Sequence, residues 1–147
     1  MTRWVGENVP RKEGPEKVSG SARYIDDLHV DGMWHGATVR SSAPRGTIRE
    51  IRFADDIPWD EFVIVRAEDI PGPNYIALMH DDQPCLADGR VNHADEPVLL
   101  IAHPDRLLVK KARDAIEVVI DPEPAVLSID EALAADPVIW GEANIIK

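Results

Sequence analysis

Cysteine is nearly absent from this chain, and its scarcity limits the chemistry that the chain can perform. The 147 residues include a single cysteine, Cys85. One thiol can form neither an intrachain disulfide nor a Cys-x-x-Cys metal pair, and an iron–sulfur cluster needs several thiolates. We therefore expect any iron–sulfur centre to reside on another chain or segment.

Long hydrophobic runs and clusters of basic residues are missing as well. No apolar run approaches the roughly 20 residues that cross a bilayer, and the amino-terminal residues lack the apolar stretch of a signal peptide. The 16 basic residues are scattered among 27 acidic ones, for a net charge of -11, so no basic stripe could neutralise phosphates. These absences predict a cytoplasmic protein that binds neither nucleic acid nor a membrane.

What is present is the composition of an ordinary folded domain. Hydrophobic residues make up 44% and charged residues 29% of the chain, which is far from the composition of disordered proteins. A chain of this length buries about 70% of its unfolded surface. The sequence therefore predicts one folded domain with a substantial core.

The first half of the chain combines an irregular start with short strands. Residues 1–21 contain several prolines and glycines and have no apolar period, so we predict an extended arm. After it, turn residues separate short apolar segments, and we predict strands over Met33–Ser41, Thr47–Phe53 and Phe62–Val65. This spacing is typical of an antiparallel meander.

The last third has a different pattern. The continuous apolar run Val98–Ala102 predicts a strand that is buried on both faces. Pro104 suits the first turn of a helix, and apolar residues from Leu108 to Ile116 recur at helical spacing. A strand at Val118–Ile120 would complete a compact α/β unit.

A second, shorter helix is predicted from a local signal. Ser128 and Glu131 have the spacing of a capping box, which begins a helix that we extend through Ala135. Together with the strands, the two helices place the chain in the α+β class.

The residue types needed for catalysis do not occur in productive patterns. His80 and His93 each lie beside carboxylates, but neither has the i, i+4 partner of a helical zinc motif. The stretch Gly14–Gly20, which contains Lys17, lacks the spacing of a phosphate-binding loop, and no serine lies in a nucleophile-elbow pattern. We therefore predict no catalytic, cofactor-binding or metal-ligating residue in this chain.

Several short stretches, taken in order, resemble one known family. They are Pro10-Arg11, Gly14–Gly20, Ala22–Tyr24 with Asp26-Asp27, Val39–Ser41, Ala67–Gly72 and Glu96–Val98. Their order and spacing are similar to those of the amino-terminal α/β hammerhead domain of the xanthine dehydrogenase and aldehyde oxidase family, the molybdenum hydroxylase large subunits. The resemblance runs from about residue 5 to 135.

The resemblance implies a fold, a division of the chain and a parent activity. The implied fold is a mostly antiparallel, twisted sheet with two helices. The implied division is an extended arm at 1–21, the hammerhead domain at 22–137 and a linker at 138–147 towards a molybdopterin-binding domain. The parent enzyme would hydroxylate an aldehyde or an N-heterocycle such as a purine at a molybdenum–molybdopterin centre and would pass electrons to iron–sulfur clusters and FAD in partner domains or subunits.

The family's molybdopterin-contacting segments and catalytic glutamate lie downstream of this domain, so the resemblance assigns no catalytic residue here. It implies instead a non-catalytic domain that packs on the molybdopterin-binding domain. Since Arg and Tyr are favoured at interfaces, the predicted docking residues are Arg11, Lys17, Arg23, Tyr24, Arg40 and Ser41.

Two departures from the family pattern bear on turn geometry. Asp95 stands where the family commonly has glycine, and Arg40-Ser41-Ser42-Ala43-Pro44 replaces a shorter Arg-Ser-Pro step.

Two alternative functions also stay open. One is a barrel-sandwich-like binding or carrier module, although no lysine lies in a predicted hairpin tip. The other is a small self-contained hydrolase that uses His80 or His93.

Overall fold

The protein is described from a computed structural model, which covers residues 5–77, 81–139 and 141–145. The contacts within the chain divide it into two units, and the break falls between Met33 and Trp34. The predicted boundary between arm and domain, at residues 21 and 22, therefore lies inside the first unit.

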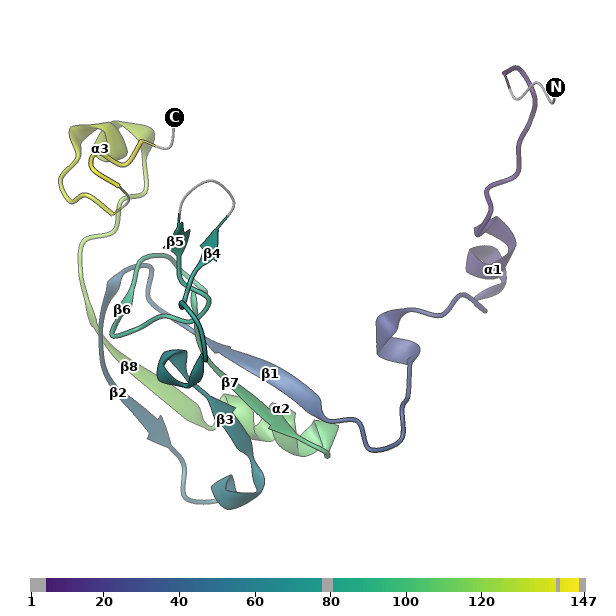
Figure 1. The fold of residues 1–147 in the computed structure, drawn as a ribbon, viewed down its shortest axis with the longest axis horizontal. Helices are drawn as coiled ribbons and strands as arrows, with labels where there is room; N and C mark the ends of the chain where they lie inside the picture. The colour runs from purple at the N-terminus through teal and green to yellow at the C-terminus, as the bar shows by residue number, and fades with distance from the viewer. Residues whose placement is uncertain (1–4, 78–80, 140, 146–147) are drawn as a thin grey trace. The chain divides into compact units, whose positions relative to one another are not determined.

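The first unit contains a helix where the sequence predicts extended chain. Helix α1 spans Gly14–Ser19 and buries none of its residues (Figure 1). Local signals explain it, because Pro15 suits the first turn and Gly20 ends the helix with a positive φ of 75°. Lys17 also pairs with Glu13 across one turn at 3.0 Å. A 3-10 turn, η1, follows at Ile25–Asp27.

The second unit consists mainly of two three-stranded sheets (Figure 1). Their strand orders are β1-β7-β3 and β6-β2-β8, a hairpin β4-β5 makes a third sheet, and every recorded pairing is antiparallel. This confirms the predicted α+β class. The strands are β1 His35–Arg40, β2 Gly46–Phe53, β3 Val63–Val65, β4 Ile76–Ala77, β5 Asp81–Gln83, β6 Arg90–Val91, β7 Pro97–His103 and β8 Ile116–Pro122.

Helices occupy little of this unit. Helix α2 spans Arg106–Asp114, α3 spans Ile129–Ala134, and short 3-10 turns lie at Trp59–Glu61 (η2) and Ala67–Asp69 (η3). In the described ranges, every helix is too short or too polar to cross a bilayer. The two helices that the sequence predicts are thus α2 and α3, and α1 is additional.

Strand β7, helix α2 and strand β8 follow one another as predicted, but they do not form a parallel unit. Strand β8 pairs antiparallel with β2 along its whole length, from Gly46 opposite Pro122 to Phe53 opposite Ile116. Strand β7 instead lies between β1 and β3. Helix α2 therefore leads from one sheet to the other.

Helix α2 begins after Pro104, which the sequence predicts to lie in the first turn. Its N-cap is Asp105, whose carboxylate accepts hydrogen bonds from the amides of Leu107 at 2.7 Å and Leu108 at 3.1 Å. These two backbone donors lower the pKa of Asp105. Pro104 therefore lies before the cap and not in the first turn.

The predicted capping box of α3 is confirmed. The Ser128 hydroxyl accepts from the amide of Glu131 at 3.2 Å, and the Glu131 carboxylate accepts from the amide of Ser128 at 3.1 Å. Backbone donors at Leu127 and Ser128, with the Ser128 side chain, lower the pKa of Glu131.

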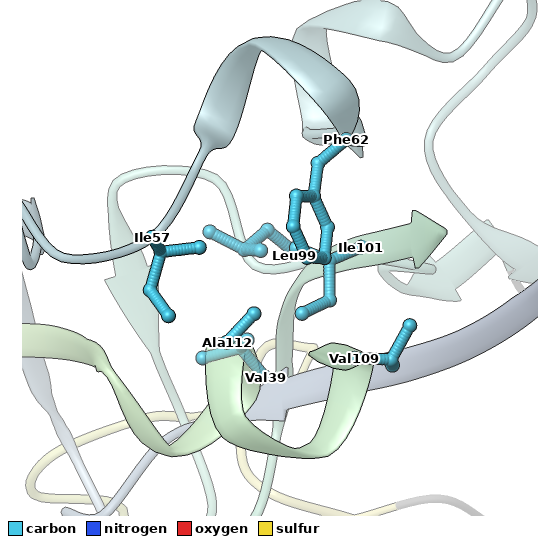
Figure 2. Close-up of a cluster of buried hydrophobic side chains, with 7 residues drawn as sticks. All are labelled: Val39, Ile57, Phe62, Leu99, Ile101, Val109 and Ala112. Carbon is cyan, nitrogen blue, oxygen red and sulfur yellow. The ribbon is translucent and has the colours of Figure 1, made fainter. Parts of the chain in front are cut away.

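The larger core lies between the β1-β7-β3 sheet and α2. Figure 2 shows Leu99 and Ile101 of β7 facing Val109 and Ala112 of α2. Phe62, which comes just before β3, closes the cluster with Val39 and Ile57. A smaller cluster at Ala87, Val91 and Val98 packs against the β6-β2-β8 sheet.

Candidate functional site

The two faces of the β1-β7-β3 sheet have different surroundings. Leu100 of β7 lies opposite Thr38 of β1 on one side and opposite Val65 of β3 on the other, so these three side chains form one row across the sheet. The next row on the same face is Gly36, Ala102 and Val63. We call this six-residue set the outer face.

The opposite, inner face is the covered one. Leu99 and Ile101 alternate with Leu100 along β7, and they are 0% and 1% exposed beneath α2. On the outer face, by contrast, Leu100 is 40% and Val63 is 48% exposed. The prediction that Val98–Ala102 is buried on both faces is therefore wrong for the second unit, because the core residues of this unit cover the inner face and leave Leu100 exposed.

The outer face is grooved. One groove of about 310 Å³ lies over Gly36, Val63 and Ala102, and a second of about 440 Å³ extends past Leu100 to Cys85. Thr38, Val65 and Leu100 line both. The two grooves therefore belong to one continuous apolar surface.

The end of β1 and the start of β7 are joined by contacts between Arg40-Ser41 and Asp95-Glu96, which we call the corner. Arg40 and Ser41 are predicted docking residues. Arg40 donates from Nη1 to the carbonyl of Asp95 at 2.8 Å. The amide of Ser41 donates to the carbonyl of Glu96 at 2.9 Å, and the amide of Asp95 donates to the carbonyl of Ser41 at 3.1 Å. Both predicted residues thus hold the corner together.

Burial limits what this corner can present to a partner. Ser41 is 2% exposed, and its hydroxyl donates to the carbonyl of Ala43 at 2.6 Å. Glu96 is also 2% exposed, and its carboxylate accepts from the amide of Asn92. Arg40 is exposed, so it is the one of the two predicted residues that can reach a partner.

Asp95 explains the first departure from the family pattern. Its φ of 61° lies in the left-handed region, which glycine adopts freely and which aspartate tolerates better than most residues. A glycine at this position therefore meets the same backbone requirement, and the turn keeps its geometry with aspartate in its place.

A second polar cluster, which the sequence does not reveal, holds the connector after β8. Arg45 is 8% exposed and donates to the carbonyl of Pro124 at 2.7 Å. Arg45 also forms an ion pair with Glu123 at 3.2 Å. Arg90 forms a second ion pair with the same carboxylate. The Arg90 hydrogen bond lowers the pKa of Glu123. These contacts join residues 33 to 79 positions apart, so no local spacing could show them.

The other four predicted docking residues lie in the first unit. Lys17 is on α1 and pairs with Glu13, and Tyr24, 60% exposed, donates its amide to Asp27 at 2.9 Å. Arg11 and Arg23 are exposed as well. The structure thus brings Arg40 and Ser41 together in one corner, and docking by any of the six stays a prediction.

The donor sets of the described residues do not fit a metal or a cluster. In residues 5–77, 81–139 and 141–145, no three His, Cys, Asp or Glu side chains converge in a way that could hold a metal ion. The ring of His93 contacts the neighbouring carbonyl of Ala94, while His80 lies outside the described residues.

Comparison with known proteins gives a consistent match. Residues 19–124 match the family described as aldehyde oxidase and xanthine dehydrogenase, a/b hammerhead domain. The chain is 27% identical over 94% of its length to the nicotine 6-hydroxylase large subunit of Paenarthrobacter nicotinovorans. It is also 27% identical over 96% of its length to the nicotinate dehydrogenase large molybdopterin subunit of Eubacterium barkeri. It spans only 18% and 34% of these two relatives.

A solved structure supports the same assignment. Quinoline 2-oxidoreductase from Pseudomonas putida 86 superposes with a TM-score of 0.75 and 27% identity, over 90% of this chain and 18% of that one. The carrier and hydrolase alternatives find no support in these matches. The chain belongs to the aldehyde oxidase and xanthine dehydrogenase family, as its a/b hammerhead domain.

Proposed function

We propose that this chain is a non-catalytic structural and assembly domain of a molybdopterin-dependent oxidoreductase. The observation that carries the proposal is the hammerhead match over residues 19–124. The chain covers only 18% and 34% of two relatives that are named as large subunits. In this proposal the reaction takes place on the remainder of the large subunit, and this chain helps to hold that remainder in place.

The proposed parent reaction is hydroxylation of an aldehyde or an N-heterocycle such as a purine. The names of the relatives favour the heterocycle, since nicotine, nicotinate and quinoline all contain a ring nitrogen. Molybdopterin would be the cofactor of the remainder, and iron–sulfur and flavin domains or subunits would receive the electrons.

The geometry supports a mechanical contribution. Two sheets share one core, with Ile101 of one and Val118 of the other both at the main cluster. The Arg40 corner and the Arg45 cluster tie the strand ends and the following connector to that core. Such a domain presents a fixed surface because close packing resists deformation.

Purification from the native organism tests the proposal. The chain is tagged at its own genomic position, and molybdenum is measured in the purified material and in the separately produced 147-residue chain. We expect stoichiometric molybdenum in the first sample and none in the second, together with oxidation of aldehydes or purines by the first sample only. Stoichiometric molybdenum or turnover in the chain alone would contradict the proposal.

A further inference from the structure

We infer that the outer face of the β1-β7-β3 sheet is the surface on which the molybdopterin-binding remainder of the large subunit packs. The occupant would be an apolar surface of that remainder. This inference rests on the proposed function and deepens it by assigning the contact to one face.

The first argument is the side-chain pattern of β7. It is the central strand of its sheet, and its residues are apolar on both faces from Val98 to Ala102. An antiparallel strand with one face in solvent usually alternates apolar and polar residues, whereas a continuous apolar run is typical of a strand that is covered on both faces. Here Leu99 and Ile101 have their cover, while Leu100 is 40% exposed. The side of β7 that carries Leu100 therefore calls for a covering surface outside the second unit.

The second argument is the chemistry of the face. Its six residues are glycine, alanine, valine, leucine and threonine, without one charged group, in a chain with 43 charged residues (16 basic plus 27 acidic). The centres of protein interfaces are depleted in charge in the same way. Large exposed apolar patches with polar surroundings mark interaction sites. An apolar partner surface fits these properties, whereas a charged or nucleic-acid partner does not.

The third argument concerns the occupant. The two curated relatives are about three and about five and a half times as long as the matched segment, because the chain spans 34% and 18% of them. In those proteins the hammerhead segment is therefore part of a polypeptide whose remaining residues outnumber it several-fold. Arg40, the exposed predicted docking residue, lies at the rim of this face, since it pairs with Pro97, which lines the larger groove.

The chain offers a built-in probe of this face. Cys85 is its only cysteine, and it lines the larger groove beside Leu100. We expect a bulky maleimide to label the Cys85 peptide at least about tenfold more slowly in the purified molybdenum-containing protein than in the separately produced chain. Mass spectrometry of that peptide distinguishes Cys85 from cysteines of the remainder.

Matched lysine variants provide the second measurement. Leu100→Lys puts a charge into the outer face, and Leu107→Lys puts the same charge on α2, where Leu107 is 78% exposed. A lysine in an apolar interface has no partner and is costly to desolvate. We expect L100K to raise Cys85 labelling in the molybdenum-containing protein at least about tenfold, and L107K to leave it unchanged. Thermal unfolding of both isolated variants checks that they fold, and Thr38→Arg replaces L100K if that variant does not.

The outcomes separate this inference from the proposed function. If no molybdenum accompanies the native chain, the proposed function fails, and the inference fails with it. If molybdenum accompanies the chain but Cys85 reacts as fast as in the isolated chain, the inference alone is wrong. Equal effects of L100K and L107K would also overturn the inference, because the contact would then not be specific to the outer face.

Discussion

The two faces of the β1-β7-β3 sheet are built from similar residues but differ in burial. On the inner face Leu99 and Ile101 pack against α2 and are essentially inaccessible. On the outer face Leu100, one position away from each, keeps 40% of its surface. Composition alone does not distinguish the two faces. The difference teaches that an apolar face is part of a chain's own core only where the same chain supplies the element that covers it.

The largest change in the free energy of unfolding is expected when a leucine side chain on each face is replaced by alanine. Leu99→Ala should lower the free energy of unfolding by about 3 kcal/mol, because it leaves a cavity in the core. Leu100→Ala should lower it by less than about 1 kcal/mol, because Leu100 loses less burial on folding. Urea unfolding of the isolated chain measures both. Equal losses would mean that the chain covers its own outer face.

A smaller loss in the free energy of unfolding is expected at the corner. This corner fixes where β7 starts and therefore which of its side chains face outward. Glu96→Ala removes the buried acceptor for the amide of Asn92 and should cost about 2 kcal/mol. The control is Glu68→Ala, an exposed carboxylate 4.0 Å from Arg66, which should cost less than about 0.5 kcal/mol. Similar losses in the two variants would show that the corner does not stabilise the sheet.

The backbone of the same corner allows a finer comparison. Asp95→Ala should destabilise by about 1 kcal/mol, because alanine is strained at a φ of 61°. Asp95→Gly should be close to neutral, since glycine adopts this conformation freely. Thermal unfolding of the two variants side by side tests the assignment. A glycine variant as unstable as the alanine variant would point to the aspartate side chain instead of the backbone.

The smallest effect expected is a loss of stability at low pH through the cap of α2, the helix that covers the inner face. Hydrogen bonds from the amides of Leu108 and Leu107 lower the pKa of Asp105 below its ordinary value of 3.8, so the cap of α2 is fully effective above that value. Its contribution is lost as the pH falls towards the lower folded-state pKa. We expect α2, and the inner face beneath it, to loosen in acid. Asp105→Asn keeps an acceptor without a titrating carboxyl, so its unfolding temperature should vary less between pH 5 and 2. An unchanged pH profile in D105N would refute this role.

Much of the fold could be predicted because the signals are local. The capping box at Ser128 and Glu131 and the helical spacing from Leu108 to Ile116 depend on residues within one or two turns. Helix α1 escaped prediction for a related reason, since Pro15 and Gly20 read as breakers when no apolar period accompanies them. Here they are the start and the end of the helix. For α2 the sequence prediction relies on Pro104, whereas the N-cap is the next residue, Asp105.

The candidate surface could be predicted only in part. The run Val98–Ala102 indicates a strand with two apolar faces, but it does not tell which face α2 covers or which one needs a partner. The predicted docking set rests on residue type, and it includes Ser41, which the structure buries within the corner. The Arg45 cluster joins positions far apart in the chain, and no local pattern specifies such a contact.

The sequence by itself determined the α+β class, the order of most strands and helices, and the resemblance to the hammerhead family, because periodicity, capping and ordered motifs are properties of neighbouring residues. Only the tertiary structure decided that β7 and β8 enter different sheets and that Leu100, unlike Leu99, is exposed. The physical reason is that burial depends on which distant element packs against a face. In this chain α2 covers one face of the sheet and leaves the other open.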